Sequence, residues 1–533
     1  MKIFSSTDKQ SLTKKSIADK IKSSEKKGNT TMKFTKKLIS IIICIVMLFA
    51  LAVPAFAAEN TVKCPTVYVP GLQSSTLYTD TENPSESITT PDSATLVELI
   101  KEEVLPAFII YAATKDVDKL ALTLTSVANE AFKHWANNPD GTPVGNSGAI
   151  NTYPNPETLN ENSQIYFKYD WRGDPFAIAA ELDAYINYII ENTDYDKVAV
   201  SSHSLGGIVT LTYLSVYGYD KIAGIVFDSP AIEGVEYVGD LFCGEIEFTS
   251  EGVLTFLKGT LGENEYEDLI SSSLDILEMA GVSELIIGTF DEALDKIAPT
   301  VFRETLLPIF GSWLSIWAMV PPERIDEAMT YIFDDFCKDQ DLAAIRSKIE
   351  KYNTIVRDNR VATLLGYDEV GRVAVISRYG HTCFPITSSW NLVGDAVIET
   401  NSTSFGATTA PLGDYFSDEY LEGKDMKYIS PDKTVDASTC LFPEKTWFIK
   451  EILHEETKYT KQMHSQLLFG KEEATCDSSD FDRFSIFDRE TDTISADQSK
   501  PQKAEKPTAL QRLFNFLKAF IEQLIIFLTK TDN

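Results

Sequence analysis

The stretch "KVAVSSHSLGGIVT" (197–210) decides the fold predicted for this 533-residue chain. Its first half is typical of a buried β-strand, and its second half is typical of an α-helix. Ser204 lies between the two, with Ser202 two positions before it and Gly206 two positions after it. Small residues at both places permit a sharp turn that exposes the serine at the edge of a sheet. The stretch therefore predicts a nucleophilic serine, and the alternative is a serine that only caps the helix.

Strands alternate with helices on both sides of this stretch. The runs that look like strands are 66–71, 165–171, 222–228, 372–380 and 446–453, and those with helical periodicity are 177–191 and 207–217. This alternation predicts an α/β fold, in which a mostly parallel sheet is flanked by helices.

Two helical segments interrupt the alternation, at 94–136 and at 245–365. The second reads as a helical cap, or lid, inserted into the sheet domain. Its residues Trp313 and Trp317 could contact acyl chains, although aromatic residues at helical spacing also form the core of such a cap. The predicted segments are 1–57 (extension and signal peptide), 58–244 (first part of the core), 245–365 (cap), 366–475 (second part of the core), 476–507 (linker) and 508–533 (amphipathic helix).

The first 57 residues have the composition of an export signal. They contain eleven Lys and three acidic residues, a net charge of +8. A lysine-rich start after Met32 is followed by the apolar run Leu38–Val53 and by Ala55-Phe56-Ala57, which fits a cleavage site. A membrane anchor is the alternative, but 16 residues are short for one. We therefore expect a secreted protein, in which residues 1–31 are an upstream extension or a misassigned start.

Charge and cysteine content narrow the functional classes. The whole chain carries a formal charge of −31, so the part after the signal carries about −39, which argues against nucleic-acid binding. Six cysteines follow the signal, and they could form three disulfides or remain buried thiols. No CxxC or His/Cys metal spacing is visible, so no metal is predicted. These cysteines are Cys64, Cys243, Cys337, Cys383, Cys440 and Cys476.

The C-terminal region divides into a polar part and an apolar part. Residues 476–507 are rich in Asp, Ser and Lys and read as a linker or a disordered tail. Residues 510–528 read as an amphipathic helix with its polar residues on one side. Such a helix could contact a membrane, the cell surface or a partner, or it could dock onto the body of the protein.

Four motifs, in this order, resemble those of the lecithin:cholesterol acyltransferase-like branch of the α/β-hydrolase lipases. They are "VPGLQSSTL" (69–77), "YDWRGDP" (169–175), "SHSLGG" (202–207) and "NLVGDAVIETNST" (391–403). The resemblance is scattered over 62–460, and it implies an α/β-hydrolase fold with a lid. The sequence departs from the family pattern at Ser202, where Gly or Ala is usual. It departs again at Ala396-Val397, where Gly-Thr or Asp-Thr commonly follow the acid.

The loop after the first strand is predicted to supply part of an oxyanion hole. In α/β-hydrolases one donor is an amide of this loop, and the other is the amide of the residue after the nucleophile. The amides of Leu72 and Leu205 are the predicted donors, with Gln73 as the alternative to Leu72. By resemblance, Asp170 and Arg172 of the YDWR motif form an ion pair that organises this region rather than taking part in the chemistry.

The acid and base of the predicted triad follow the chain order Ser…Asp…His. Asp395 lies in a loop 15 residues after the strand at 372–380, where the resembled family has its acid, and Asp228 is the alternative. The predicted base is His454, because it closes the last core strand at 446–453. His381 is the alternative base, but it precedes the acid.

The predicted reaction is acyl transfer from a lipid ester through an acyl-enzyme on Ser204, with no cofactor. With water as acceptor the protein would be a lipase or esterase. With an alcohol acceptor or a glycerophospholipid substrate it would be an acyltransferase or phospholipase. A protein that keeps the fold and only binds a surface is the third hypothesis.

Overall fold

The computed structural model describes residues 63–88, 116–132, 134–246, 307–385, 387–470 and 474–502, with a few isolated positions between 103 and 114. All of them belong to the compact unit Thr61–Asn533. The predicted signal peptide and the predicted amphipathic helix at 510–528 lie outside the described residues, as does the cap between 247 and 306.

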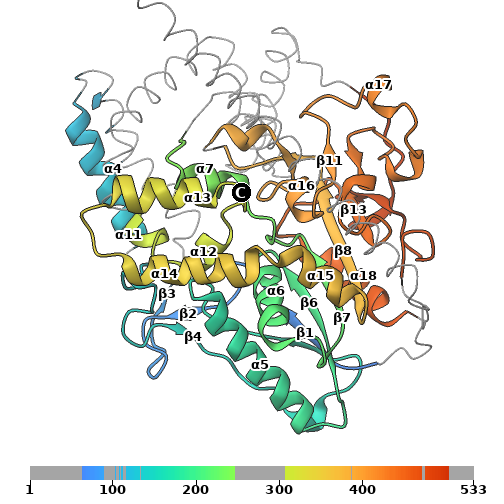
Figure 1. Cartoon of the computed structure of the whole chain (residues 1–533), viewed down its shortest axis with the longest axis horizontal. Helices are drawn as coiled ribbons and strands as arrows, with labels where there is room; N and C mark the ends of the chain where they lie inside the picture. The colour runs from blue at the N-terminus through green and yellow to red at the C-terminus, as the bar shows by residue number, and fades with distance from the viewer. Residues whose placement is uncertain are drawn as a thin grey trace, which may run out of the picture. The chain divides into compact units, whose positions relative to one another are not determined.

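An eight-stranded sheet is the centre of the described structure (Figure 1). Every neighbouring pair in it is parallel except the last, β14 and β15, which is antiparallel. In spatial order its strands are β5 (Gln164–Tyr166), β1 (Thr66–Val69), β6 (Val198–His203), β7 (Ile222–Asp228), β8 (Arg372–Tyr379), β13 (Thr446–Lys450), β14 (Phe484–Asp488) and β15 (Thr493–Ala496). The predicted fold class, a mostly parallel sheet flanked by helices with a helical insertion, is confirmed.

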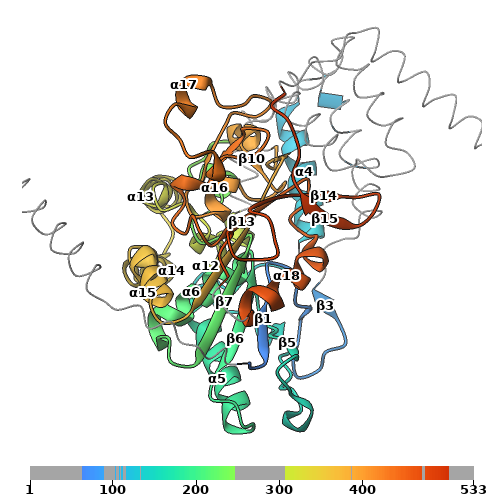
Figure 2. The same ribbon diagram turned by 90° about the vertical axis from the view of Figure 1, so that its right-hand side faces the viewer.

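The central strands are apolar on both faces because helices cover both faces. In β6, Val198 and Val200 belong to one buried cluster, and Ala199 between them belongs to another. The first cluster includes residues of α5 (Pro175–Glu191), α6 (Leu205–Tyr217) and α15 (Arg360–Asp368), and the second includes residues of α18 (Thr457–Phe469). Accordingly, α15 and α18 lie on opposite sides of the sheet (Figure 2).

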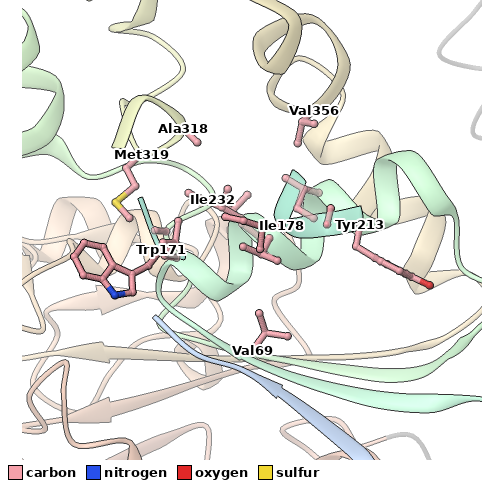
Figure 3. Packing of buried hydrophobic residues seen from close by; sticks show 14 of the residues in the cluster. Val69, Trp171, Ile178, Tyr213, Ile232, Ala318, Met319 and Val356 are labelled. Carbon is pink, nitrogen blue, oxygen red and sulfur yellow. The ribbon is translucent and has the colours of Figure 1, made fainter. Parts of the chain in front are cut away.

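The described part of the cap is helical and packs over α6. It contains α12 (Leu314–Ala318), α13 (Ile325–Met329) and α14 (Ala343–Tyr352), drawn in yellow (Figure 1). Ala318 and Met319 of this segment lie on the opposite side of α6 from Val69 of β1 (Figure 3). The cap and the α/β core therefore share one continuous hydrophobic cluster.

The two tryptophans of the cap belong to its core. Trp313 and Trp317 are fully buried. The ring of Trp313 packs against Trp135 and Trp171, with centroid distances of 5.5 and 5.1 Å, and Trp317 stacks on Phe333 at 5.2 Å. Of the two interpretations of this aromatic segment, contact with acyl chains or a place in the core of the cap, these contacts agree with the second.

The prediction of a linker at 476–507 is wrong over 484–496, because β14 and β15 complete the sheet there. Phe484 and Phe487 are buried, and Phe484 stacks on Phe448 of β13 at 5.4 Å. Charged residues of this segment have partners on the body of the protein; Arg483, for example, pairs with Glu444 at 2.9 Å. A short strand at the edge of a sheet needs few apolar residues, so composition does not reveal it.

The six cysteines at 64–476 are thiols in the structure rather than disulfides, and four of them are buried. Burial raises the pKa of Cys440 to about 11 and that of Cys476 to about 12. Across the ranges that the structure covers, no helix combines the length and apolarity needed to cross a membrane.

We expect a chain shortened to end at Asp480 to be less stable than one that ends at Gln502. The shorter chain exposes the edge of β13 and loses two buried phenylalanines, each worth about 1.5–3 kcal/mol. The midpoint of thermal unfolding, measured for the two shortened chains and for the full chain, gives the difference in stability. The chain ending at Gln502 is the matched control, because it also lacks residues 503–533 but keeps β14 and β15. Equal midpoints for the two shortened chains would contradict the assignment of β14 and β15.

Candidate active site

Ser204 lies at the sharp turn between β6 and α6. Its backbone has φ 54° and ψ −122°, a strained conformation for any residue other than glycine. Its amide donates to the carbonyl of Asp228 at 3.2 Å, and its carbonyl accepts hydrogen bonds from Gly207 at 2.9 Å and Ala231 at 3.1 Å. These three bonds hold the strained turn in place, as a strand-to-helix nucleophile turn requires.

The glycine that this turn requires is Gly206. A Cβ atom at 206 would lie 2.0 Å from the carbonyl oxygen of Val69, so no larger residue fits without moving β1. Ser202, by contrast, lies inside β6, where its hydroxyl donates to the carbonyl of Val226 at 3.4 Å. The departure from the family pattern at Ser202 is therefore accommodated by an ordinary strand position.

The loop after β1 brings the predicted oxyanion donors to the same place. Gly71 packs directly on the nucleophile turn, since a Cβ atom there would lie 2.8 Å from Cβ of Ser204. In the described part of the chain the Leu72 amide donates no hydrogen bond, and the Leu205 amide opens α6, where no intrahelical acceptor exists. Gln73, the alternative donor, has a left-handed backbone with φ 59°.

The YDWR motif holds this loop. The hydroxyl of Tyr169 donates to the carbonyl of Pro70 at 2.5 Å, and the indole N–H of Trp171 donates to the carbonyl of Ser75 at 3.0 Å. Asp170 and Arg172 form an ion pair of 2.7 Å, with the arginine fully buried. The motif thus has the organising geometry that the resemblance implies.

Asp395 and His454 form a buried pair. Nδ1 of His454 lies 2.7 Å from Oδ2 of Asp395, and the His454 amide donates to the Asp395 carbonyl at 2.9 Å. Oδ1 of Asp395 accepts hydrogen bonds from the amides of Val397 at 3.0 Å and Ile398 at 2.7 Å. Ala396 makes this turn with φ 80°, a left-handed backbone that favours glycine. The carboxylate is therefore held in one orientation toward the imidazole.

This pairing shifts the pKa of both groups. Burial alone would raise the pKa of Asp395, but the charge and hydrogen bond of His454 and the Ile398 amide lower it to about 2. Burial alone would lower the pKa of His454, but the charge and hydrogen bond of Asp395 outweigh it and raise the pKa above 6.5. At neutral pH Asp395 is ionised and can stabilise a protonated imidazole.

Ser204 and His454 line one pocket of about 390 Å³, together with Leu72 and Gln73. The ring of His454 lies 4.5 Å from that of His203, measured between centroids. Within the described residues no hydrogen bond joins the Ser204 hydroxyl to His454. Such contacts are often long before substrate binds. The structure thus brings the predicted serine, base, acid and oxyanion loop to one place.

The alternative acid and base have other surroundings. Both Asp228 and His381 are buried, and neither lines the pocket. The carboxylate of Asp228 is bound by Arg378 at 2.9 Å, Thr460 at 2.5 Å and His464 at 3.1 Å. Burial lowers the pKa of His381, and its Nε2 has no hydrogen-bond partner in the described chain. Asp228 thus pairs with the imidazole of His464, which contacts Ser201 rather than Ser204, and His381 has no carboxylate partner of this kind in the described chain.

Two further pocket residues were not predicted from the sequence. Tyr237 comes from α7 (Glu236–Phe242), and Met319 follows α12 of the cap. Burial raises the pKa of Tyr237 above its ordinary value, so its hydroxyl is neutral at neutral pH. Neither residue lies in a recognisable motif, because Tyr237 reaches the pocket through the packing of α7 and Met319 through the packing of the cap.

Comparison with known proteins assigns no family. No family model matches the chain, and no curated protein matches it. Among solved structures, a chain from "The crystal structure of Tle4-Tli4 complex" matches with 13% identity and a TM-score of 0.20. The match covers 34% of this chain and 48% of the matched chain, so this chain spans about half the length of the protein that it matches. At that TM-score the likeness supports no conclusion about function.

We expect Asp395→Asn to lower the pKa of His454, because burial then acts on the imidazole without the opposing charge. Titration of the His454 ring by NMR, assigned with His454→Gln, measures the shift. Asp432→Asn is the matched control, since this buried carboxylate pairs with Lys450 at 2.8 Å and does not contact His454. A His454 pKa that stays at its wild-type value in Asp395→Asn would contradict the pairing.

The same shifts predict how the pair contributes to stability at different pH. The lowered pKa of Asp395 gives stability that is present above about pH 3.9 and is lost as the pH falls toward about 2. The raised pKa of His454 gives stability that is present below about pH 6.5 and is lost as the pH rises through the folded value. Asp395→Asn should remove both contributions. The free energy of unfolding, measured for the wild type and the variant across this pH range, detects the loss.

Proposed function

We propose that the protein is a secreted serine hydrolase that cleaves carboxylic esters of lipids through an acyl-enzyme on Ser204. One observation carries the proposal: Ser204, on a strained strand-to-helix turn, lines the same pocket as His454, whose other ring nitrogen is bound by Asp395. The resemblance of four motifs to the lecithin:cholesterol acyltransferase-like lipases supports the same assignment.

In the proposed reaction the Ser204 hydroxyl attacks the ester carbonyl while Nε2 of His454 takes its proton. The Asp395 carboxylate stabilises the resulting imidazolium and keeps Nδ1 protonated. The tetrahedral oxyanion is bound by the Leu72 and Leu205 amides, and loss of one such donor typically costs about 100- to 1,000-fold in rate. The oxyanion then collapses, and the leaving alcohol takes the proton from His454.

The second half of the reaction uses the same groups. Water enters the pocket and gives a proton to His454 as its oxygen attacks the acyl-enzyme. Collapse of this second tetrahedral oxyanion releases the fatty acid, and Ser204 regains its proton from His454. An alcohol in place of water would give a new ester, so the acceptor alone distinguishes hydrolysis from transfer.

The lipid substrate is inferred from the walls of the pocket and from the sequence. Leu72, Val235, Met319, Val397 and Ile398 give the pocket an apolar lining beside Ser204. Polar residues, among them Gln73 and Glu455, form the rest of the lining. The apolar part suits an acyl chain, and the polar part suits the ester group and the head of a lipid. The predicted signal peptide supports secretion, and the predicted helix at 510–528 would give the enzyme a means of contact with a membrane.

We expect a fluorophosphonate probe to label the wild-type protein once, at Ser204. Ser204→Ala should lose the label and lower kcat for ester hydrolysis by roughly 10⁶-fold. Ser202→Ala is the matched control, because it removes a neighbouring buried hydroxyl of β6 and should keep the label. A folded wild-type protein that is not labelled would contradict the proposed function and favour a surface-binding protein.

The choice of substrate and acceptor requires a separate assay. Esters of increasing chain length should be cleaved faster as the chain lengthens, and a preference for short chains would contradict a lipid substrate. Incubation of phospholipid vesicles with the enzyme and ethanol should release free fatty acid. A product that is mainly ethyl ester would show a transferase instead.

A further inference from the structure

Arg378 of β8 is a fully buried arginine behind the candidate active site. Its Nη1 donates to the carbonyls of both Leu453 and His454, the residues that lead into the pocket from β13. Its Nη2 forms an ion pair with Oδ1 of Asp228 at 2.9 Å. One guanidinium therefore connects the backbone of the proposed base to a buried carboxylate.

Asp228 continues this connection to the nucleophile. Its carbonyl accepts the hydrogen bond of the Ser204 amide at 3.2 Å, and it lies 3.0 Å from Nδ1 of His203. Its second carboxylate oxygen accepts hydrogen bonds from Thr460 and His464 of α18, so the carboxylate cannot turn away from Arg378. The turn at Ser204 and the backbone of His454 are thus linked through two residues.

The backbone of Arg378 also contacts the segment that carries Asp395. Its carbonyl accepts a hydrogen bond from the hydroxyl of Thr400 at 2.8 Å. Thr400 begins α16 (Thr400–Thr403), two residues after the turn 395–398 that holds the Asp395 carboxylate. Arg378 is therefore connected to all three segments of the proposed triad.

Stability alone is a weak reason for this arrangement. A buried ion pair loses so much hydration that apolar residues of similar volume are often as stable or more stable. In the described chain the Nε of Arg378 has no hydrogen-bond partner, which adds to the cost. What apolar residues could not supply is a rigid planar group that binds two successive carbonyls and a carboxylate at once.

We propose that Arg378 is a positioning residue for the reaction: it fixes the His454 backbone relative to Ser204, with Asp228 as its counter-charge. This inference rests on the proposed function. A lysine at 378 would keep the charge but could not hold both carbonyls and Asp228 in one plane. Arg378→Lys and Arg378→Met therefore separate charge from geometry.

We expect Arg378→Met to lower kcat for a soluble ester by about 10- to 100-fold, with KM changed less than about threefold, because a displaced base slows the proton transfer. Arg378→Lys should recover part of this loss.

The charged and titratable groups that act on His454 include Asp395, Glu455, Arg378 and His203, and the positive charge of Arg378 lowers the pKa of His454. Arg378→Met should therefore shift the acid limb of kcat/KM to higher pH, and Arg378→Lys should not.

Two further variants separate positioning from stability. Arg378→Met/Asp228→Asn removes both charges of the pair, so no charge is left buried alone, and it should fold and remain slow. Arg483→Met is the matched control, because Arg483 is another buried arginine that binds a carboxylate, Glu444, and a backbone carbonyl, that of Pro443. It should lose stability but keep the wild-type kcat per probe-labelled molecule.

The outcomes distinguish this inference from the proposed function. A folded Arg378→Met or double variant with wild-type kcat would overturn the positioning role while the wild-type enzyme stays active. A folded wild-type protein with neither probe labelling nor ester hydrolysis would overturn the proposed function, and the role of Arg378 with it.

Discussion

The close packing of the nucleophile turn against the end of β1 is the constraint on which the site depends. Gly206 brings α6 so near β1 that even one added carbon would overlap the Val69 carbonyl, and Gly71 lies against Ser204 in the same way. Because of these two contacts, the loop at Leu72 reaches the serine. The strained backbone of Ser204 is tolerable only because hydrogen bonds from Gly207 and other neighbours hold it on all sides.

Buried charge organises the other half of the site. Two carboxylates, those of Asp395 and Asp228, lie without exposure near the carboxyl ends of the strands, and each has a cationic or imidazole partner. Asp395 acts on the ring of His454, while Asp228 acts on its backbone through Arg378. Charges interact strongly when they are buried away from water, and here their hydrogen bonds hold them at fixed distances. This arrangement therefore sets both the position of the His454 imidazole and its affinity for a proton.

Strand-helix alternation predicted the parallel sheet, and the small residues around Ser204 predicted the nucleophile turn, because both are local signals. Asp395 and His454 were predicted from chain order together with the resemblance to the lipase family, which has its acid in this kind of loop. The edge strands at 484–496 escaped prediction because their charged residues are paired on the body and only two phenylalanines are buried. Met319 and Arg378 escaped it because their positions depend on contacts between segments far apart in the chain, which no single motif encodes.

The structure of the protein after reaction with a long-chain alkyl phosphonate ester would test the central claim most directly. The account predicts phosphorus bonded to Oγ of Ser204, with the phosphoryl oxygen within hydrogen-bond distance of the Leu72 and Leu205 amides. It also predicts Nε2 of His454 beside the bound group while Nδ1 remains on Asp395. An adduct on another residue, or a phosphoryl oxygen directed away from both amides, would contradict it.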